Sequence, residues 1–346
     1  MKKMKMLSMM LTTMLLASFM FVSCTKEGPA GLPGKDGTNG EDGINGADGT
    51  ATCAVCHDNS EKIEAFIGQW GVSDHAIGGH NFENRTTCAP CHTSQGFREV
   101  VGTDLTATAE AISNPSNINC YTCHNIHATY TSSDWELRKT GPHKFWLTQE
   151  TVDLGNSNLC LSCHQPRTSY TIPDVTKPND MYNVTSSRFG PHYGSQGSTL
   201  LGVAYFMVGS GYSNSAHANI DNACVNCHMA DAAGYNAGGH TFKIYDAYEE
   251  GYNVAGCVAC HTAEESELLI EELHTEVAAL MEELRVKLEV AGIYNPANGM
   301  AKTGEHTNTV AGAYWNWKSV KEDQSLGVHN PKFVKRVLQN SINALP

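Results

Sequence analysis

The sequence predicts a mainly α-helical protein with long loops and little β-sheet, and three observations predict it. A five-residue motif recurs along the chain at short intervals. The segments between its copies are rich in Gly, Ser, Thr and Asn and lack the long alternating patterns that strands need. Near the C-terminus, apolar residues recur at helical spacing over many turns. We therefore expect short helices at the motif copies, loops between them and one long C-terminal helix.

The repeated motif is Cys-x-x-Cys-His, and the chain contains six copies of it. Their cysteines are Cys53, Cys56, Cys88, Cys91, Cys120, Cys123, Cys160, Cys163, Cys224, Cys227, Cys257 and Cys260. Their histidines are His57, His92, His124, His164, His228 and His261. The motifs use twelve of the 13 cysteines, although the chain has only 16 histidines to follow them. This regularity indicates one cofactor chemistry repeated six times.

One Cys-x-x-Cys alone is compatible with a redox dithiol, half of a zinc site or a haem anchor. The histidine favours haem, because the two thiols add to the vinyl groups of one porphyrin while the adjacent imidazole ligates the iron. A redox dithiol does not need the histidines, and zinc sites pair Cys-x-x-Cys with a distant second pair. We expect six covalently bound haem c groups in a multihaem cytochrome c fold. At roughly fifty residues per haem, the porphyrins themselves form much of the core.

The N-terminal segment predicts export and lipidation. Residues 1–23 have a basic start and an apolar run, as in a signal peptide. They end in Phe-Val-Ser before Cys24, which resembles a bacterial lipobox, so we expect an acylated Cys24 and a lipid-anchored N-terminus at residues 24–27. No other segment approaches the roughly 18 apolar residues of a membrane span. We expect a protein lipid-anchored to the bacterial outer membrane, at the cell surface or facing the periplasm.

Residues 28–50 form a collagen-like spacer ahead of the hexahaem cytochrome c domain, residues 51–346. Glycine occupies every third position from Gly28 to Gly49, as a collagen triple helix requires. Only Pro29 and Pro33 add rigid rings, so we favour an extended spacer over a trimerisation element. A trimer or another homo-oligomer stays open as the alternative.

The formal net charge of −13 bears on the choice of partner. A strongly acidic chain does not suit nucleic acid, because the phosphates repel it. We expect a redox protein with a basic or neutral docking surface, or an extracellular electron acceptor.

Each haem iron needs a sixth ligand or keeps an open position. Ten histidines lie outside the motifs, against five methionines beyond the signal segment, so we expect bis-histidine ligation and low-potential, low-spin centres. The candidate distal ligands are His75, His127, His192, His217, His240 and His329, with His80 and His143 as reserves. His127 lies three residues after His124, so we expect it to serve a neighbouring haem.

A long amphipathic helix follows the last motif. A capping box of Thr262 and Glu265 opens it, and it ends near Gly292. Its apolar stripe consists of Leu269, Leu273, Val277, Leu280, Leu284 and Leu288. We expect this stripe to pack on the haem core or on a partner subunit.

Two more helices are predicted towards the C-terminus. The first carries Tyr314, Trp315 and Trp317, whose rings are suited to packing against porphyrin. Asn330 and Pro331 predict the N-cap and the first residue of the last helix. That helix start would hold His329 rigidly just outside it.

Residues 88–345 resemble the superfamily of pentahaem cytochrome c nitrite reductase, octahaem tetrathionate reductase and hydroxylamine oxidoreductase. The likeness lies in the order and intervals of the last five motifs, in CHM followed by GGHTF, and in a Trp-rich segment that ends in GVHNP. The resemblance implies four distal ligands. His217 would serve the haem of Cys257 and Cys260, and His240 that of Cys120 and Cys123. His329 would serve the haem of Cys224 and Cys227, and His75 that of Cys160 and Cys163.

The chain departs from the reductases at their catalytic haem. The nitrite reductase holds that haem by a lysine, whereas this chain has an ordinary CAPCH with His92, and an extra haem at Cys53 and Cys56 lies beside it. We expect His127 or His192 to close the sixth position there, so we assign no catalytic residue. Two functions follow. We favour a surface-tethered electron conduit that uses bis-His haems, and the alternative is a reductase of nitrite, hydroxylamine or a sulfur oxyanion at one five-coordinate haem.

Overall fold

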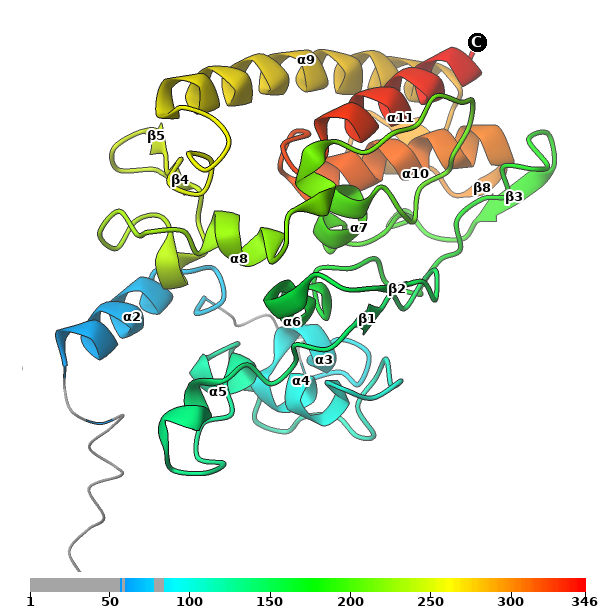
Figure 1. Ribbon diagram of the computed structural model, residues 1–346. Helices are drawn as coiled ribbons and strands as arrows, with labels where there is room; N and C mark the ends of the chain where they lie inside the picture. The colour runs from blue at the N-terminus through cyan, green and yellow to red at the C-terminus, as the bar shows by residue number, and fades with distance from the viewer. Residues whose placement is uncertain (1–56, 58–59, 78–83) are drawn as a thin grey trace, which may run out of the picture. The chain divides into compact units, whose positions relative to one another are not determined.

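A computed structural model of the chain describes residue 57, residues 60–77 and residues 84–346 (Figure 1). The signal segment, Cys24, the collagen-like spacer, the first cysteine pair Cys53 and Cys56, and His80 lie outside the described residues.

Four of the motifs lie on short helices or begin on one, as the sequence predicts, and the fourth motif continues past the end of its helix. These helices are α3 (Ala89–His92), α5 (Cys120–Cys123), α6 (Asn158–Leu161) and α8 (Ala223–His228). Helix α5 begins at a capping box in which Asn119 and Thr122 bond to each other's backbone N–H groups. The sixth motif, Cys257–His261, forms turns instead. Short helices suffice here because each needs only to present two thiols and one imidazole.

Other short elements connect the motifs. Helix α2 (Glu61–Gly71) precedes the second motif, α4 (Ser94–Val100) follows it, and α7 (Gln196–Leu201) comes before the fifth. The 3-10 turns are η3 (Ser132–Trp135), η4 (Gly155–Ser157), η5 (Ala216–Asn219) and η6 (Gly239–Thr241).

Apart from two isolated bridges, the β-structure of the described residues consists of two-stranded antiparallel ladders. They pair β1 (His143–Lys144) with β2 (Thr151–Val152), β3 (Met181–Val184) with β8 (Gly304–Thr307), β4 (Tyr245–Asp246) with β5 (Gly251–Tyr252), and β6 (Tyr294–Asn295) with β7 (Met300–Ala301). The prediction of a mainly helical fold with little sheet is confirmed.

Three long helices build the C-terminal part of the fold, drawn in yellow, orange and red in Figure 1: α9 (Ala263–Val290), α10 (Asn308–Asp323) and α11 (Pro331–Ala344). Each of the three packs against the other two. The predicted capping box at Thr262 and Glu265 is confirmed, and so is Pro331 as the first residue of α11. Over the described ranges, no helix combines the length and apolar character that a membrane crossing requires.

The main apolar core lies between these helices. Val277, Leu284 and Leu288 of α9 are fully buried in it, whereas Leu269 is 47% exposed, so the stripe predicted for α9 is wrong at that position. Ile270 is buried in its place. The difference arises because the buried stripe of a long straight helix drifts around its axis.

The aromatic residues of α10 belong to this protein core. Tyr314 and Trp315 are fully buried, and the Trp315 Nε1–H donates to Ala204 O at 2.9 Å. Trp317 is 4% exposed and donates to Met281 O at 3.1 Å. The expectation that these rings pack against porphyrin is wrong. Residues 262–346 carry no motif, so their helices are free to bury one another's side chains.

The motif-bearing region holds a much smaller apolar cluster, made of Phe145, Leu154, Leu161, Leu200 and Ala223. The long loops around it offer little other buried apolar surface. The contribution of porphyrin to this part of the core stays a prediction.

Candidate haem sites

Five of the six motif histidines each lie opposite a histidine from another part of the chain. The ring centroids are 6.3 Å apart for His57 and His127, 6.3 Å for His92 and His192, 6.4 Å for His124 and His240, 6.2 Å for His164 and His75, and 6.0 Å for His228 and His329. The angles between the ring planes range from 28° to 69°, so no common stacking geometry explains the recurring distance.

The recurring gap fits a metal ion between the rings. A metal–imidazole bond is about 2.0 Å long, so two imidazoles on opposite sides of one metal have ring centroids about 6 Å apart. Such a pair, together with the thiols beside one of its members, is the ligand set of a bis-histidine haem c. The residues present therefore fit the group that the motifs predict.

Hydrogen bonds at Nδ1 orient several of these imidazoles. His124 contacts Trp135 O at 2.6 Å, His228 contacts Phe242 O at 2.9 Å, and His164 contacts Gln196 Oε1 at 3.2 Å. A ring that donates its N–H through Nδ1 presents the lone pair of Nε2, which is the atom that binds a metal. Histidines that ligate metals are held by such hydrogen bonds at the other ring nitrogen in most metal sites.

Burial keeps several of the paired imidazoles neutral. It is the largest cause that lowers the pKa of His75, His192 and His228 to about 4, with added repulsion from neighbouring cationic groups. A neutral imidazole is the form that ligates a metal. These residues are therefore in the ligand form at neutral pH.

Helix α2 positions two of the histidines. The side chain of Gln69 donates to Gly234 O at 3.2 Å and accepts from the His240 backbone N–H at 3.0 Å. The ring of Phe66 lies 4.5 Å from that of His240. His75 follows the end of the helix, so the docking of α2 also carries His75 towards His164.

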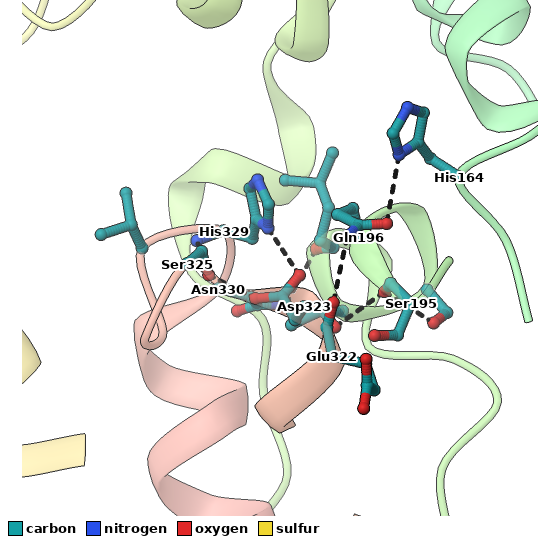
Figure 2. A network of polar contacts seen from close by, with 12 residues as sticks. His164, Ser195, Gln196, Glu322, Asp323, Ser325, His329 and Asn330 are labelled. Atoms are coloured by element: carbon teal, nitrogen blue, oxygen red, sulfur yellow. Dashed lines mark hydrogen bonds and ion pairs between the residues drawn. The ribbon is translucent and has the colours of Figure 1, made fainter. Parts of the chain in front are cut away.

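His329 sits in a network that joins the end of α10 to α7 (Figure 2). Its Nδ1–H donates to Asp323 Oδ1 at 2.7 Å, and the hydroxyl of Ser325 donates to the other oxygen of that carboxylate. Burial alone would lower the pKa of His329, but the charge and hydrogen bond of Asp323 raise it. Nearby, Gln196 donates to Glu322 O at 3.1 Å while its own Oε1 contacts His164.

Asn330 holds the loop that carries His329. It is the N-cap of α11 by position, but its side chain does not cap the helix. Instead it accepts from Ser215 N at 2.8 Å and donates to Leu200 O at 2.9 Å. The side chain therefore ties the start of α11 to the segment before His217.

Neither His217 nor His261 belongs to the five ring pairs given above. His217 Nδ1 contacts Val328 O at 2.7 Å, which orients its ring in the same way as those above. His261 is half-buried after the turns of the sixth motif. The pairing of these two histidines, which the family resemblance implies, stays a prediction.

The motifs themselves lie close together. The Cys163 thiol contacts Pro90 O at 3.8 Å and lies close enough to the Cys91 thiol for each to shift the pKa of the other. Cys160 and Cys224 are neighbours of the same kind. The fourth motif therefore lies between the second and the fifth.

The reserve candidate His143 does not pair with a motif histidine in any contact that the described residues make. It is 3% exposed, its Nδ1 lies 3.2 Å from Lys139 Nζ, and its Nε2 has no hydrogen-bond partner among the described residues. Burial, followed by the charge of Lys139, lowers its pKa to about 4. It borders a cavity of about 290 Å³ that Phe97 and Trp146 also line.

Sequence reasoning missed the residues that orient the imidazoles. Asp323, Gln196 and Gln69 belong to no motif, and each acts across a distance that sequence spacing does not reveal. The one available signal was the nearness of Asp323 to GVHNP, six residues before His329.

The chain is similar to one known protein family and to one solved structure. Residues 210–345, less than half of the chain, match the sequence model of the cytochrome c552 family. The crystal structure of the outer cell wall cytochrome OcwA matches with a TM-score of 0.50 and 19% sequence identity, over 80% of this chain and 50% of OcwA. The chain thus shares a fold with OcwA and spans half of its length. No curated protein matches the chain.

Proposed function

We propose that this multihaem c-type cytochrome is a hexahaem electron conduit whose irons are all closed by two histidines. The observation that carries the proposal is the His92–His192 pair, with ring centroids 6.3 Å apart. The family resemblance locates a catalytic open position at this haem. An imidazole on each side leaves no exchangeable position, so substrate cannot bind to the iron.

The chemistry of such a centre is electron transfer alone. Bound haem would supply a reversible one-electron couple, and two histidine ligands would place its potential below that of a Met/His haem. The chain's own residues hold the geometry: Gln69 supports His240, Gln196 supports His164, and Asp323 supports His329. Fixed ligands leave little structure to reorganise when the iron changes charge.

Contacts between the motifs support a continuous path for electrons. Cys163 lies beside Cys91, and Cys160 beside Cys224, so the haem of the fourth motif has neighbours on two sides. Cys257 lies close enough to Cys227 to affect the pKa of its thiol, which places the sixth motif next to the fifth. His127, three residues after His124, lies opposite His57, which links the first and third motifs. Cys123 of the third motif lies near Cys160, which links the third motif to the fourth.

We further propose that the conduit works outside the cytoplasm, held by acylated Cys24 on the spacer of residues 28–50. The lipobox-like sequence supports this, and so does the fold shared with a cytochrome named for the outer cell wall. Its electron acceptor is a redox protein with basic or neutral surface, or an extracellular acceptor, because the chain is acidic.

The alternative is a haem reductase of nitrite, hydroxylamine or a sulfur oxyanion. It needs an open iron beside polar groups that deliver protons. Tyr170, a candidate for such a group, packs instead on Phe189 with ring centroids 5.6 Å apart. The Arg167 guanidinium donates to Ser169 at 3.1 Å, and its charge also acts on His192, so it lies near this site. The conduit is favoured by the closed His92–His192 pair and not by the position of Arg167.

Electron paramagnetic resonance of the oxidised protein tests the proposal. We expect only low-spin ferric signals in the wild type, and no turnover of nitrite or hydroxylamine with a reduced dye. His192→Ala should add one high-spin signal, because it removes the ligand opposite His92. His306→Ala is the matched control, since the ring of His306 contacts Lys302 O at 3.1 Å and the residue lies in β8, which carries no motif. A high-spin signal with turnover in the wild type would defeat the conduit.

A further inference from the structure

The carboxylate of Asp323 lies in an unusual environment for a charged group. It is the last residue of α10, where the helix dipole already carries partial negative charge, and its side chain is fully buried. Burying an unpaired charge is costly, so a carboxylate persists there only when a partner compensates it. The neighbouring Glu322 has its own partner in the ammonium of Lys318. Helix stability therefore does not explain Asp323.

The compensating group is the imidazole of His329. The Nδ1 to Oδ1 distance of 2.7 Å is that of a charge-assisted hydrogen bond. Ser325 secures the geometry, because its hydroxyl bonds the second carboxylate oxygen and also accepts from the His329 backbone N–H at 3.3 Å. On its other side, His329 lies opposite His228 at 6.0 Å.

Other paired imidazoles contact uncharged acceptors through Nδ1. His124 and His228 each contact a backbone carbonyl, and His164 contacts the side-chain amide of Gln196. A carboxylate acceptor differs because it draws the N–H proton away from the ring and makes Nε2 a stronger electron donor. The Asp323 charge also acts on His228, on the far side of the same gap.

We infer that Asp323 is a positioning residue that lowers the reduction potential of the haem bound by Cys224 and Cys227. The inference rests on the proposed function, since it requires a haem between His228 and His329. The bound haem would supply a one-electron step between its ferric and ferrous forms, with a neighbouring haem as the electron donor, and no bond or proton would change place. A nearby negative charge stabilises the ferric form, which has one more positive charge, and so makes this step less favourable.

A lowered reduction potential at this haem would change how electrons are distributed among the neighbouring haems. Cys224 contacts the fourth motif and Cys227 lies next to the sixth, so the haem is an intermediate stop on the path. A haem with a more negative reduction potential than its neighbours holds an electron only briefly, so the electrons reside mainly on the haems at either side. Asp323 would thereby separate electrons near the sixth haem from those near the fourth.

A potentiometric titration followed by electron paramagnetic resonance tests the inference on the intact holoprotein. In Asp323→Asn, we expect one low-spin signal to change its g values and its midpoint to rise. At a fixed potential the ferrous to ferric ratio of that haem should increase about tenfold, which is about 59 mV for one electron. Glu322→Gln is the matched control, because it also removes a buried carboxylate from the end of α10 but leaves the His329 contact intact.

The outcomes separate this inference from the proposed function. Unchanged midpoints in Asp323→Asn, or equal shifts in Glu322→Gln, would overturn the role of Asp323 while the conduit stands. A wild-type protein whose fifth haem lacks His329 as ligand would instead overturn the conduit. If Asp323→Asn does not mature with all its haems, the same titration of Ser325→Ala tests the role of Asp323. Loss of that hydroxyl should strengthen the pull of Asp323 and lower the same midpoint, and no shift would refute the inference.

Discussion

His127 and His192 both hold the left-handed backbone conformation, with φ of 60° and 68°. This conformation costs an L-residue with a Cβ roughly 1 to 2 kcal/mol, so the surrounding structure must impose it. Each of the two residues lies opposite a motif histidine. A strained backbone at two independent ring pairs agrees with the ligand role that we propose for both.

His143 gives a prediction about pH at the same scale. Its pKa of about 4 in the folded protein lies below the ordinary 6.5, so the unfolded chain binds a proton that the folded protein excludes. Stability from this residue is present above pH 6.5 and falls as the pH drops from 6.5 towards 4. We expect His143→Phe to flatten that part of the curve of unfolding free energy against pH, measured by chemical unfolding and circular dichroism. An unchanged slope would contradict the buried neutral state of His143.

At the scale of elements, the motif helices and the C-terminal helices are stabilised differently. Helices such as α3 and α5 have four residues each, too few to be stable alone. We expect a cofactor bound by their thiols and the adjacent imidazoles to stabilise them. The 28-residue α9 instead buries Val277, Leu284 and Leu288 against α10 and α11. The C-terminal helices therefore form a packed platform that holds Asp323 and His329 in place.

Two leucines of α9 test this packing. Leu288 is fully buried and Leu269 is 47% exposed, so the same substitution meets different surroundings. We expect Leu288→Ala to lower the free energy of unfolding by about 2 to 5 kcal/mol, because it leaves a cavity. Leu269→Ala, as the control, should change it by less than about 0.5 kcal/mol. Equal losses in denaturant melts would show that α9 packs through the stripe that includes Leu269.

At the scale of the whole molecule, the motifs lie close to one another, and the proposed anchor at Cys24 lies outside the described residues. The fourth motif contacts the second and fifth, and the ring pairs bring in histidines from before and after it, such as His75 and His192. No motif is therefore independent of the rest. Loss of one haem would disturb the ligands of its neighbours.

Intact-mass measurement of the mature protein tests the composition of this assembly. We expect six haem additions and an acylated Cys24, with Cys24→Ala as a control that keeps the haems and loses the acyl groups. Fewer than six additions to the wild type, or processing at a bond other than Ser23–Cys24, would contradict the proposed composition.

The sequence by itself determined what is chemically local. Cys-x-x-Cys-His places two thiols and an imidazole within five residues, so its chemistry is readable at each of the six copies. The capping box at Thr262 and the start of α11 at Pro331 were also predictable, because caps depend on adjacent residues.

Only the tertiary structure decided which histidines meet and what orients them. His75 reaches His164 because α2 docks on the segment that carries His240, a contact between residues far apart in sequence. His192, not His127, lies opposite His92, and the sequence had left both open. Asp323 acts on His329 only because α10 ends beside the loop that precedes α11. Distal ligands carry no motif, since an imidazole brought in by packing needs correct position and not a particular neighbour in the chain.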